Sequence, residues 1–72
     1  MSRTLTITIN EEQSEDLKVA IIRELGSLRS VMITEEYQRV KDDKENYGWY
    51  ESREANLQAV LTQIETFQHH EV

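Results

Sequence analysis

Three large aromatic side chains lie together around one of the chain's two glycines, in the segment Tyr47-Gly48-Trp49-Tyr50. Aromatic rings supply much of the binding energy at protein interfaces, and carboxylates beside them favour a basic partner. The segment therefore predicts a partner-binding surface formed by Tyr47, Trp49, Tyr50 and four neighbouring acidic residues, Asp42, Asp43, Glu45 and Glu51. The same rings also suit a cap over the end of a helical core. Both interpretations hold if Tyr50 packs inward while Tyr47 and Trp49 stay partly exposed.

No residue pattern in the chain is typical of catalysis or of a bound cofactor. The sequence contains no cysteine, no glycine-rich phosphate loop and no nucleophile beside a recognisable base. His69, His70 and Glu71 lie in a tail, residues 69–72, that we expect to fray, so they make a poor metal site. We interpret the paired acids along the chain as helix caps and solvated faces. We therefore expect no enzymatic activity, no cofactor and no metal.

The overall charge is acidic, with 14 acidic against eight basic residues and a formal net charge of −6. The basic residues are scattered among carboxylates, which makes nucleic acid an unlikely ligand and favours a protein with a basic surface. The same acids are also explained as a means of keeping a small protein soluble. No apolar run approaches the ~20 residues of a membrane span. We expect a cytoplasmic protein that does not bind membranes.

One segment has the alternating pattern of a β-strand. In residues 3–9, Leu5, Ile7 and Ile9 point to one face of such a strand, and threonines point to the other. A single strand leaves its backbone N–H and C=O groups unpaired. We therefore expect the same strand of a second copy to pair with it about a two-fold axis, with these three apolar residues at the dimer interface. A chain of 72 residues also forms one domain with a thin core, which favours a homodimer.

The rest of the chain has the pattern of helices. Asn10 is a good N-cap, and Gln13 occupies the position of a capping-box partner for a helix over about residues 11–32. After Met32 the apolar pattern changes phase, and Thr34 resembles a new N-cap. Either the helix continues to about residue 44 or a new one starts at Thr34, and the pattern allows both.

A polar turn is expected over about residues 45–48, followed by a last helix over about 49–67. This predicts a mainly α fold, in which the N-terminal strand precedes an antiparallel helical hairpin or a three-helix arrangement. The hairpin core should be apolar residues at helical spacing: Leu17, Ile21, Leu25, Leu28, Leu57, Val60, Leu61 and Ile64.

Residues 3–40 begin with Arg-Thr-Leu-Thr-Ile-Thr-Ile-Asn-Glu-Glu, from Arg3, and continue into an amphipathic helix that closes with Leu25-Gly26. In these features the segment resembles ribbon-helix-helix repressors. It implies a DNA-binding transcriptional regulator, whose ribbon would read base edges through Arg3, Thr4, Thr6 and Thr8. The sequence departs from this family in its single basic ribbon residue and its additional C-terminal helix.

Three stretches carry a second resemblance: Leu-Thr-Ile-Thr-Ile-Asn-Glu-Glu from Leu5, Leu-Gly-Ser-Leu-Arg from Leu25, and Ser-Arg-Glu-Ala-Asn-Leu from Ser52, followed by Val60-Leu61. Through them almost the whole chain is similar to small strand-plus-helical-hairpin proteins of bacteria and phages, most of them without an assigned activity. This resemblance implies a non-enzymatic, phage-borne accessory protein. Together with the charge and the aromatic segment, it favours an inhibitor that binds a host or defence protein. Transcriptional regulation is the alternative.

Overall fold

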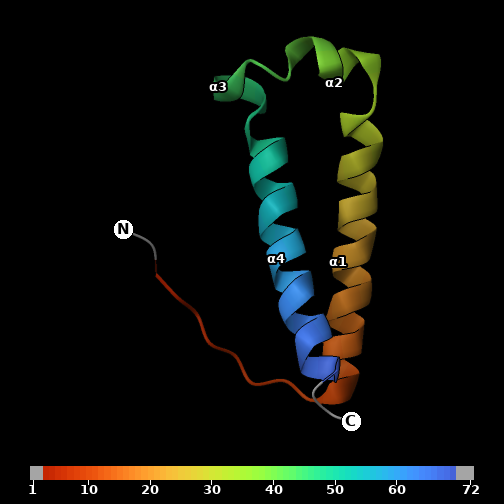
Figure 1. Cartoon of the computed structure of the whole chain (residues 1–72), viewed down its shortest axis with the longest axis vertical. Helices are drawn as coiled ribbons and strands as arrows, with labels where there is room; N and C mark the ends of the chain where they lie inside the picture. Colours follow the sequence, from red (N-terminus) through yellow and green to blue (C-terminus); the bar gives the residue numbers. More distant parts are fainter. Residues whose placement is uncertain (1–2, 70–72) are drawn as a thin grey trace.

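Two long helices packed side by side form the body of the protein (Figure 1). The computed structural model describes residues 3–69. Helix α1 comprises Glu11–Met32 and helix α4 comprises Trp49–His69, running in opposite directions. Two short helices, α2 (Glu35–Val40) and α3 (Lys44–Tyr47), connect them at one end, which we call the tip. The molecule is a helical hairpin.

Helix α1 begins at a capping box. The backbone N–H of Gln13 donates to the side-chain oxygen of Asn10 at 2.8 Å, and the backbone N–H of Asn10 donates to Oε1 of Gln13 at 3.0 Å. These bonds satisfy backbone groups that have no partner within the helix. Glu11 and Glu12 in the first turn also suit the positive end of the helix dipole.

The chain does not continue as one helix beyond Met32. Of the two possibilities that the sequence left open, the structure has the restart, because Thr34 caps α2 by accepting a hydrogen bond from the N–H of Tyr37 at 3.2 Å. Helix α2 ends at Val40, and Asp43 then caps α3. The predicted turn over residues 45–48 instead lies largely in α3, and residues 41–43, which begin with a turn, connect α2 to α3.

The core lies along the seam between α1 and α4. Ile21 and Leu25 of α1 pack with Leu61 and Ile64 of α4, and Leu17 and Leu57 flank this cluster. Burying one such side chain contributes about 1.5–3 kcal/mol. Leu28 and Tyr37 are buried nearer the tip. The expectation that Val60 belongs to this core was wrong, because its side chain is 41% exposed at one side of the seam.

Polar side chains join the two long helices on both sides of the seam. Arg53 pairs with Glu24 at 3.2 Å, while Arg29 pairs with Glu54 at 2.9 Å and also reaches Gln58. All of these groups are solvent-accessible, so each pair contributes at most about 1 kcal/mol. Within the described chain, neither long helix is apolar enough over a sufficient length to cross a membrane.

The predicted N-terminal β-strand was wrong. Residues 3–10, which we call the arm, have no regular secondary structure, and residues 3–69 contain no strand at all. A strand exists only when its backbone pairs with another extended segment, and the remaining described residues fold into helices and short connections. The alternation of Leu5, Ile7 and Ile9 was therefore insufficient to form one. The ribbon shared between two copies, which depended on that strand, is withdrawn with it.

Candidate functional site

The predicted aromatic surface lies at the tip, where three helices meet. Tyr37 comes from α2, Tyr47 is the last residue of α3, and Trp49 and Tyr50 begin α4. The capped starts of α2 and α3 bring these rings together. Tyr37 was not predicted as a member of this group, although its place three residues after the N-cap Thr34 indicated that it lies in the first turn of a helix.

The rings form a continuous stack from the interior to the surface. Tyr37 is buried and meets Tyr50 edge to face, with ring centroids 5.1 Å apart. Trp49 then stacks on Tyr50 at a centroid distance of 3.9 Å and remains 51% exposed. Such pairs contribute about 0.5–1.5 kcal/mol beyond the area that they bury. The inner ring anchors the tip, and the outer ring is available to a partner.

A cavity of about 240 Å³ opens beside these rings. The three tyrosines form its aromatic wall, and Glu36 places a carboxylate at it. Its lining is Val31, Thr34, Glu36, Tyr37, Val40, Tyr47 and Tyr50. Tyr47 and Tyr50 are half-buried, so part of each ring is accessible from outside. We call this group the tyrosine cavity.

The hydroxyl group of Tyr37 is buried and forms no hydrogen bond within the described chain. Burial raises the pKa of Tyr37 above its ordinary value of 10.0, and the nearby Glu51 carboxylate raises it further. The phenol is therefore neutral at physiological pH. It acts as a packing element of the tip and not as a charged group.

The predicted acidic residues are exposed but do not all serve the same purpose. Asp43 caps α3, since the backbone N–H of Asn46 donates to its Oδ1 at 3.4 Å, and the side-chain amide of Asn46 also donates to its Oδ2 at 2.9 Å. Glu51 accepts a hydrogen bond from the Lys44 ammonium at 2.9 Å, which raises the pKa of Lys44. Asp42 and Glu45 form no ion pair with residues in the range 3–68, and neither does Glu36. The carboxylates available to a partner are therefore Glu36, Asp42 and Glu45.

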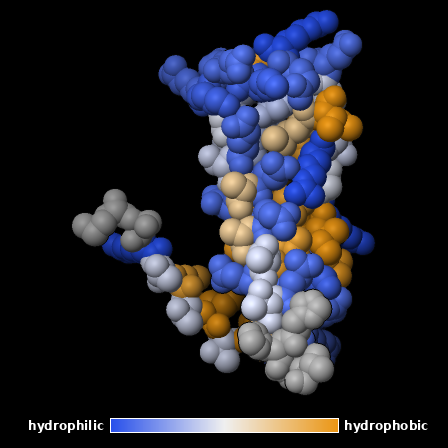
Figure 2. All heavy atoms as spheres, in the orientation of Figure 1, coloured by the Kyte–Doolittle hydropathy of each residue, from blue (hydrophilic) through white to orange (hydrophobic). Residues whose placement is uncertain are grey.

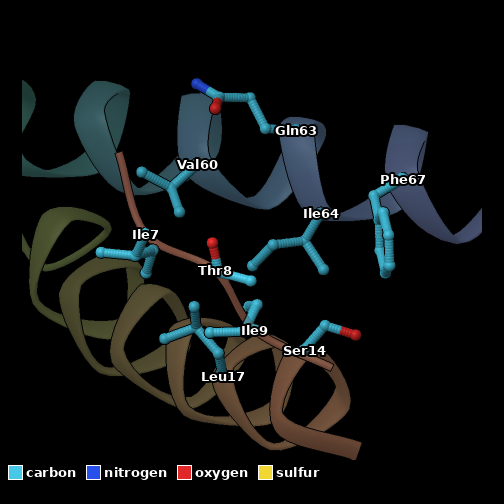
Figure 3. Close-up of a pocket in the computed structure, with 9 residues that line it drawn as sticks. All are labelled: Ile7, Thr8, Ile9, Ser14, Leu17, Val60, Gln63, Ile64 and Phe67. Atoms are coloured by element: carbon cyan, nitrogen blue, oxygen red, sulfur yellow. The ribbon is translucent and has the colours of Figure 1, made fainter. Parts of the chain in front are cut away.

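The opposite end of the hairpin has a second hollow, an apolar groove of about 390 Å³ (Figure 3). Ile7, Thr8 and Ile9 of the arm form one wall, and residues of both long helices form the others: Ser14, Leu17, Val60, Gln63, Ile64 and Phe67. This groove was not predicted from the sequence. The only signal for it was that Val60 and Phe67, seven residues apart, form a second apolar row beside the core row of α4.

The residues predicted to read DNA all lie in the arm. Arg3, Thr4, Thr6 and Thr8 are exposed and belong to an irregular segment, not to a two-stranded ribbon. The DNA-binding hypothesis has therefore lost the element that would enter a groove of the duplex. The predicted interface residues Leu5 and Ile7 are likewise exposed, whereas Ile9 is half-buried.

The described residues contain no cluster of three histidines, cysteines or carboxylates placed to hold a metal ion. The sequence placed His69, His70 and Glu71 in a tail expected to fray and to make a poor metal site. Of these three, His70 and Glu71 lie outside the described residues. Comparison with protein-family models, with curated proteins and with solved structures finds no match to this chain. The tip and the groove are therefore the two features of the described residues that bear on function.

Proposed function

We propose that this protein is a non-enzymatic interaction module whose tip binds a protein with a basic surface. One arrangement carries the proposal. The exposed Trp49 stacks on Tyr50, and Tyr50 lines the tyrosine cavity. Carboxylates at the tip have no ion-pair partner in residues 3–68. Large rings backed by fixed neighbours lose little side-chain entropy on binding, which makes them good anchors. On the face drawn in Figure 2, most residues at this end of the molecule are hydrophilic, as expected for the rim of such a site.

The chemistry of the tyrosine cavity favours a lysine or arginine side chain of the partner. The face of an aromatic ring attracts a cation, with an energy of about 0.5–1 kcal/mol at exposed sites and about 2 when water is excluded. Glu36 adds a negative charge at the same cavity. Asp42 and Glu45 would then meet basic residues around the anchor, which fits the net charge of −6.

A narrower version of the proposal is a phage-type inhibitor that acts in the cytoplasm by covering a basic groove of a host or defence protein. Its support is the small size of the chain, its acidic charge and the exposed aromatic tip. A protein whose natural ligand is polyanionic has the surface that these features would complement.

Trp49 provides a direct test, because it is the chain's only tryptophan and lies at the proposed site. Its fluorescence is titrated with a short lysine-rich peptide and with the same peptide in which glutamine replaces each lysine. We expect a saturable change with the lysine peptide that weakens as salt is added. Tyr47→Ala should weaken binding roughly two- to fivefold, since it removes one aromatic wall.

Two charge variants separate a specific site from general attraction to an acidic protein. Glu36→Gln and Glu12→Gln remove the same charge, but Glu36 lines the tyrosine cavity and Glu12 lies in the first turn of α1 at the opposite end. Only Glu36→Gln should weaken the peptide. Equal effects of the two variants, or equal binding of the glutamine peptide, would contradict the proposal.

A further inference from the structure

The hairpin is a single layer of helices. The molecule measures 45 × 30 × 16 Å along its principal axes, and one helix with its side chains is about 10–12 Å across. Stable domains generally consist of at least two packed layers around a core. This chain therefore presents most of both faces of its helix pair to solvent; within residues 3–69, only the arm at one end and the short helices α2 and α3 at the tip pack on the pair.

The solvent-accessible area of the chain also exceeds that of a compact monomer. The chain exposes 6121 Å², whereas a compact monomer of 8.5 kDa is expected to expose about 4,700 Å². Its radius of gyration is 14.9 Å, against about 11 Å for a compact domain of this length. The excess of about 1,400 Å² is larger than the roughly 800 Å² that each partner buries in a standard interface.

Much of the exposed apolar surface lies at the end that carries the arm. Leu5 and Ile7 of the arm are 85% and 58% exposed, and Val60 and Phe67 line the open groove beside them. Figure 1 shows that the arm extends away from the hairpin on the side of α4, and Figure 2 shows its apolar atoms unshielded. An apolar segment and an apolar groove that it does not fill are thus present in one chain.

We infer that two copies of this chain form a dimer by exchanging arms, so that the arm of each copy packs into the groove of the other. The chain carries both complementary parts, which is what a two-fold symmetric interface requires. Eight extended residues span about 26 Å, which is enough to cross a neighbouring hairpin. This association requires no β-strand, because the contacts are between side chains of the arm and of the helices.

One local pairing of charges favours the exchange. Arg3 is the only charged residue of the arm, and a neighbouring hollow beside the start of α1 is lined by Glu11, Glu12 and Glu15. An exchanged arm would bring that guanidinium toward these carboxylates, although the two bodies, each of charge −6, repel each other. The tip lies at the opposite end of the hairpin and stays free in such a dimer, so this inference does not depend on the proposed function.

Sedimentation equilibrium of the full chain over a range of concentrations measures the association. We expect a reversible dimer whose dissociation constant rises roughly a hundredfold or more in the double variant Leu5→Asp/Ile7→Asp. Ile33→Asp is the matched control, because Ile33 is 80% exposed but lies between α1 and α2 at the tip. A monomer at all concentrations, or a dimer that the arm variant leaves unchanged, would overturn the inference.

A disulfide distinguishes exchange from an arm that packs on its own hairpin, and it does so even if the charged variant unfolds. The chain has no cysteine, so the double variant Leu5→Cys/Gln63→Cys joins only the arm and α4; Gln63 lines the groove, whereas Leu5 is 85% exposed and does not line the groove of its own chain. Mild oxidation should produce a covalent dimer on a denaturing gel. Covalent monomers alone would mean that each arm contacts its own hairpin, and the exchange would be wrong.

Discussion

The backbone N–H of Gly48 donates to the carbonyl oxygen of Lys44 at 3.1 Å, and a Cβ atom on Gly48 would lie 2.5 Å from that same oxygen. Gly48 thus joins α3 to α4 where only a hydrogen atom fits. The other glycine, Gly26 in α1, has nothing within 4 Å of its Cβ position. A methyl group therefore fits at Gly26 but not at Gly48.

Alanine at these two positions should change stability in opposite directions. We expect Gly26→Ala to raise the free energy of unfolding by roughly 0.5–1 kcal/mol, because alanine is the better helix former. Gly48→Ala should lower it by roughly 1–3 kcal/mol, since the backbone of Lys44 must move. Urea denaturation measures the free energy of unfolding of both variants. A Gly48→Ala variant that is more stable than the original protein would contradict the close contact at the tip.

The stability of the protein should fall above about pH 10. The folded-state pKa of Tyr37 is raised above 10.0 by burial, and that of Lys44 is raised above 10.5 by its hydrogen bond to Glu51. Groups with a raised pKa in the folded state stabilise it fully below the unfolded pKa, and lose this contribution as pH rises through the folded pKa. Thermal unfolding from pH 7 to 11.5 should therefore show a declining midpoint.

Tyr37→Phe separates the contribution of the phenol from that of Lys44. The decline above pH 10 should become shallower, because phenylalanine does not ionise. At pH 7 the variant should be at least as stable as the original protein, since the buried hydroxyl makes no hydrogen bond within residues 3–68. A marked loss of stability at pH 7 would show that this hydroxyl is bonded.

Among the core positions, Leu25 should be the one at which truncation to alanine costs the most stability. It is 2% exposed at the centre of the seam, so Leu25→Ala should lower the free energy of unfolding by about 2–5 kcal/mol. Ile33→Ala is the control, because a side chain that is 80% exposed loses almost no burial. Circular dichroism in urea compares the two, and similar losses would contradict the packing of the hairpin.

The capping box at the start of α1 should be measurable as a difference between two substitutions of Asn10. Asn10→Ala removes the oxygen that accepts from Gln13 and should cost about 0.5–2 kcal/mol. Asn10→Ser keeps an acceptor at the N-cap and should cost much less. If alanine and serine behave alike in urea denaturation, the capping box does not stabilise the helix.

Local signals in the sequence explain the helices well. Asn10 with Gln13 indicated where α1 begins, and Thr34 followed by two glutamates allowed the restart that the structure contains, although the pattern left a continuous helix open as well. Both signals act within one turn of the chain, so they do not depend on the rest of the fold. The short helix α3 was missed because its four residues, among them Asn46, also suit a turn.

Features that depend on distant contacts were predicted poorly. The alternation of Leu5, Ile7 and Ile9 describes which face is apolar but not what the backbone pairs with, so the strand was wrong. Val60 occupies a regular heptad position, yet its burial depends on a second layer that the hairpin lacks. The aromatic segment was located by composition, whereas the role of Tyr37 required the path of the chain between α1 and α4.

Chemical-shift mapping with the lysine-rich peptide tests most directly whether the tip is the binding surface. Amide signals of the isotopically labelled protein are followed during the titration. We predict the largest changes at Glu36, Tyr37, Tyr47, Trp49 and Tyr50, with little change in the first turns of α1. Changes spread evenly over the acidic surface, changes centred on the groove beside Phe67, or no change at all would contradict the account.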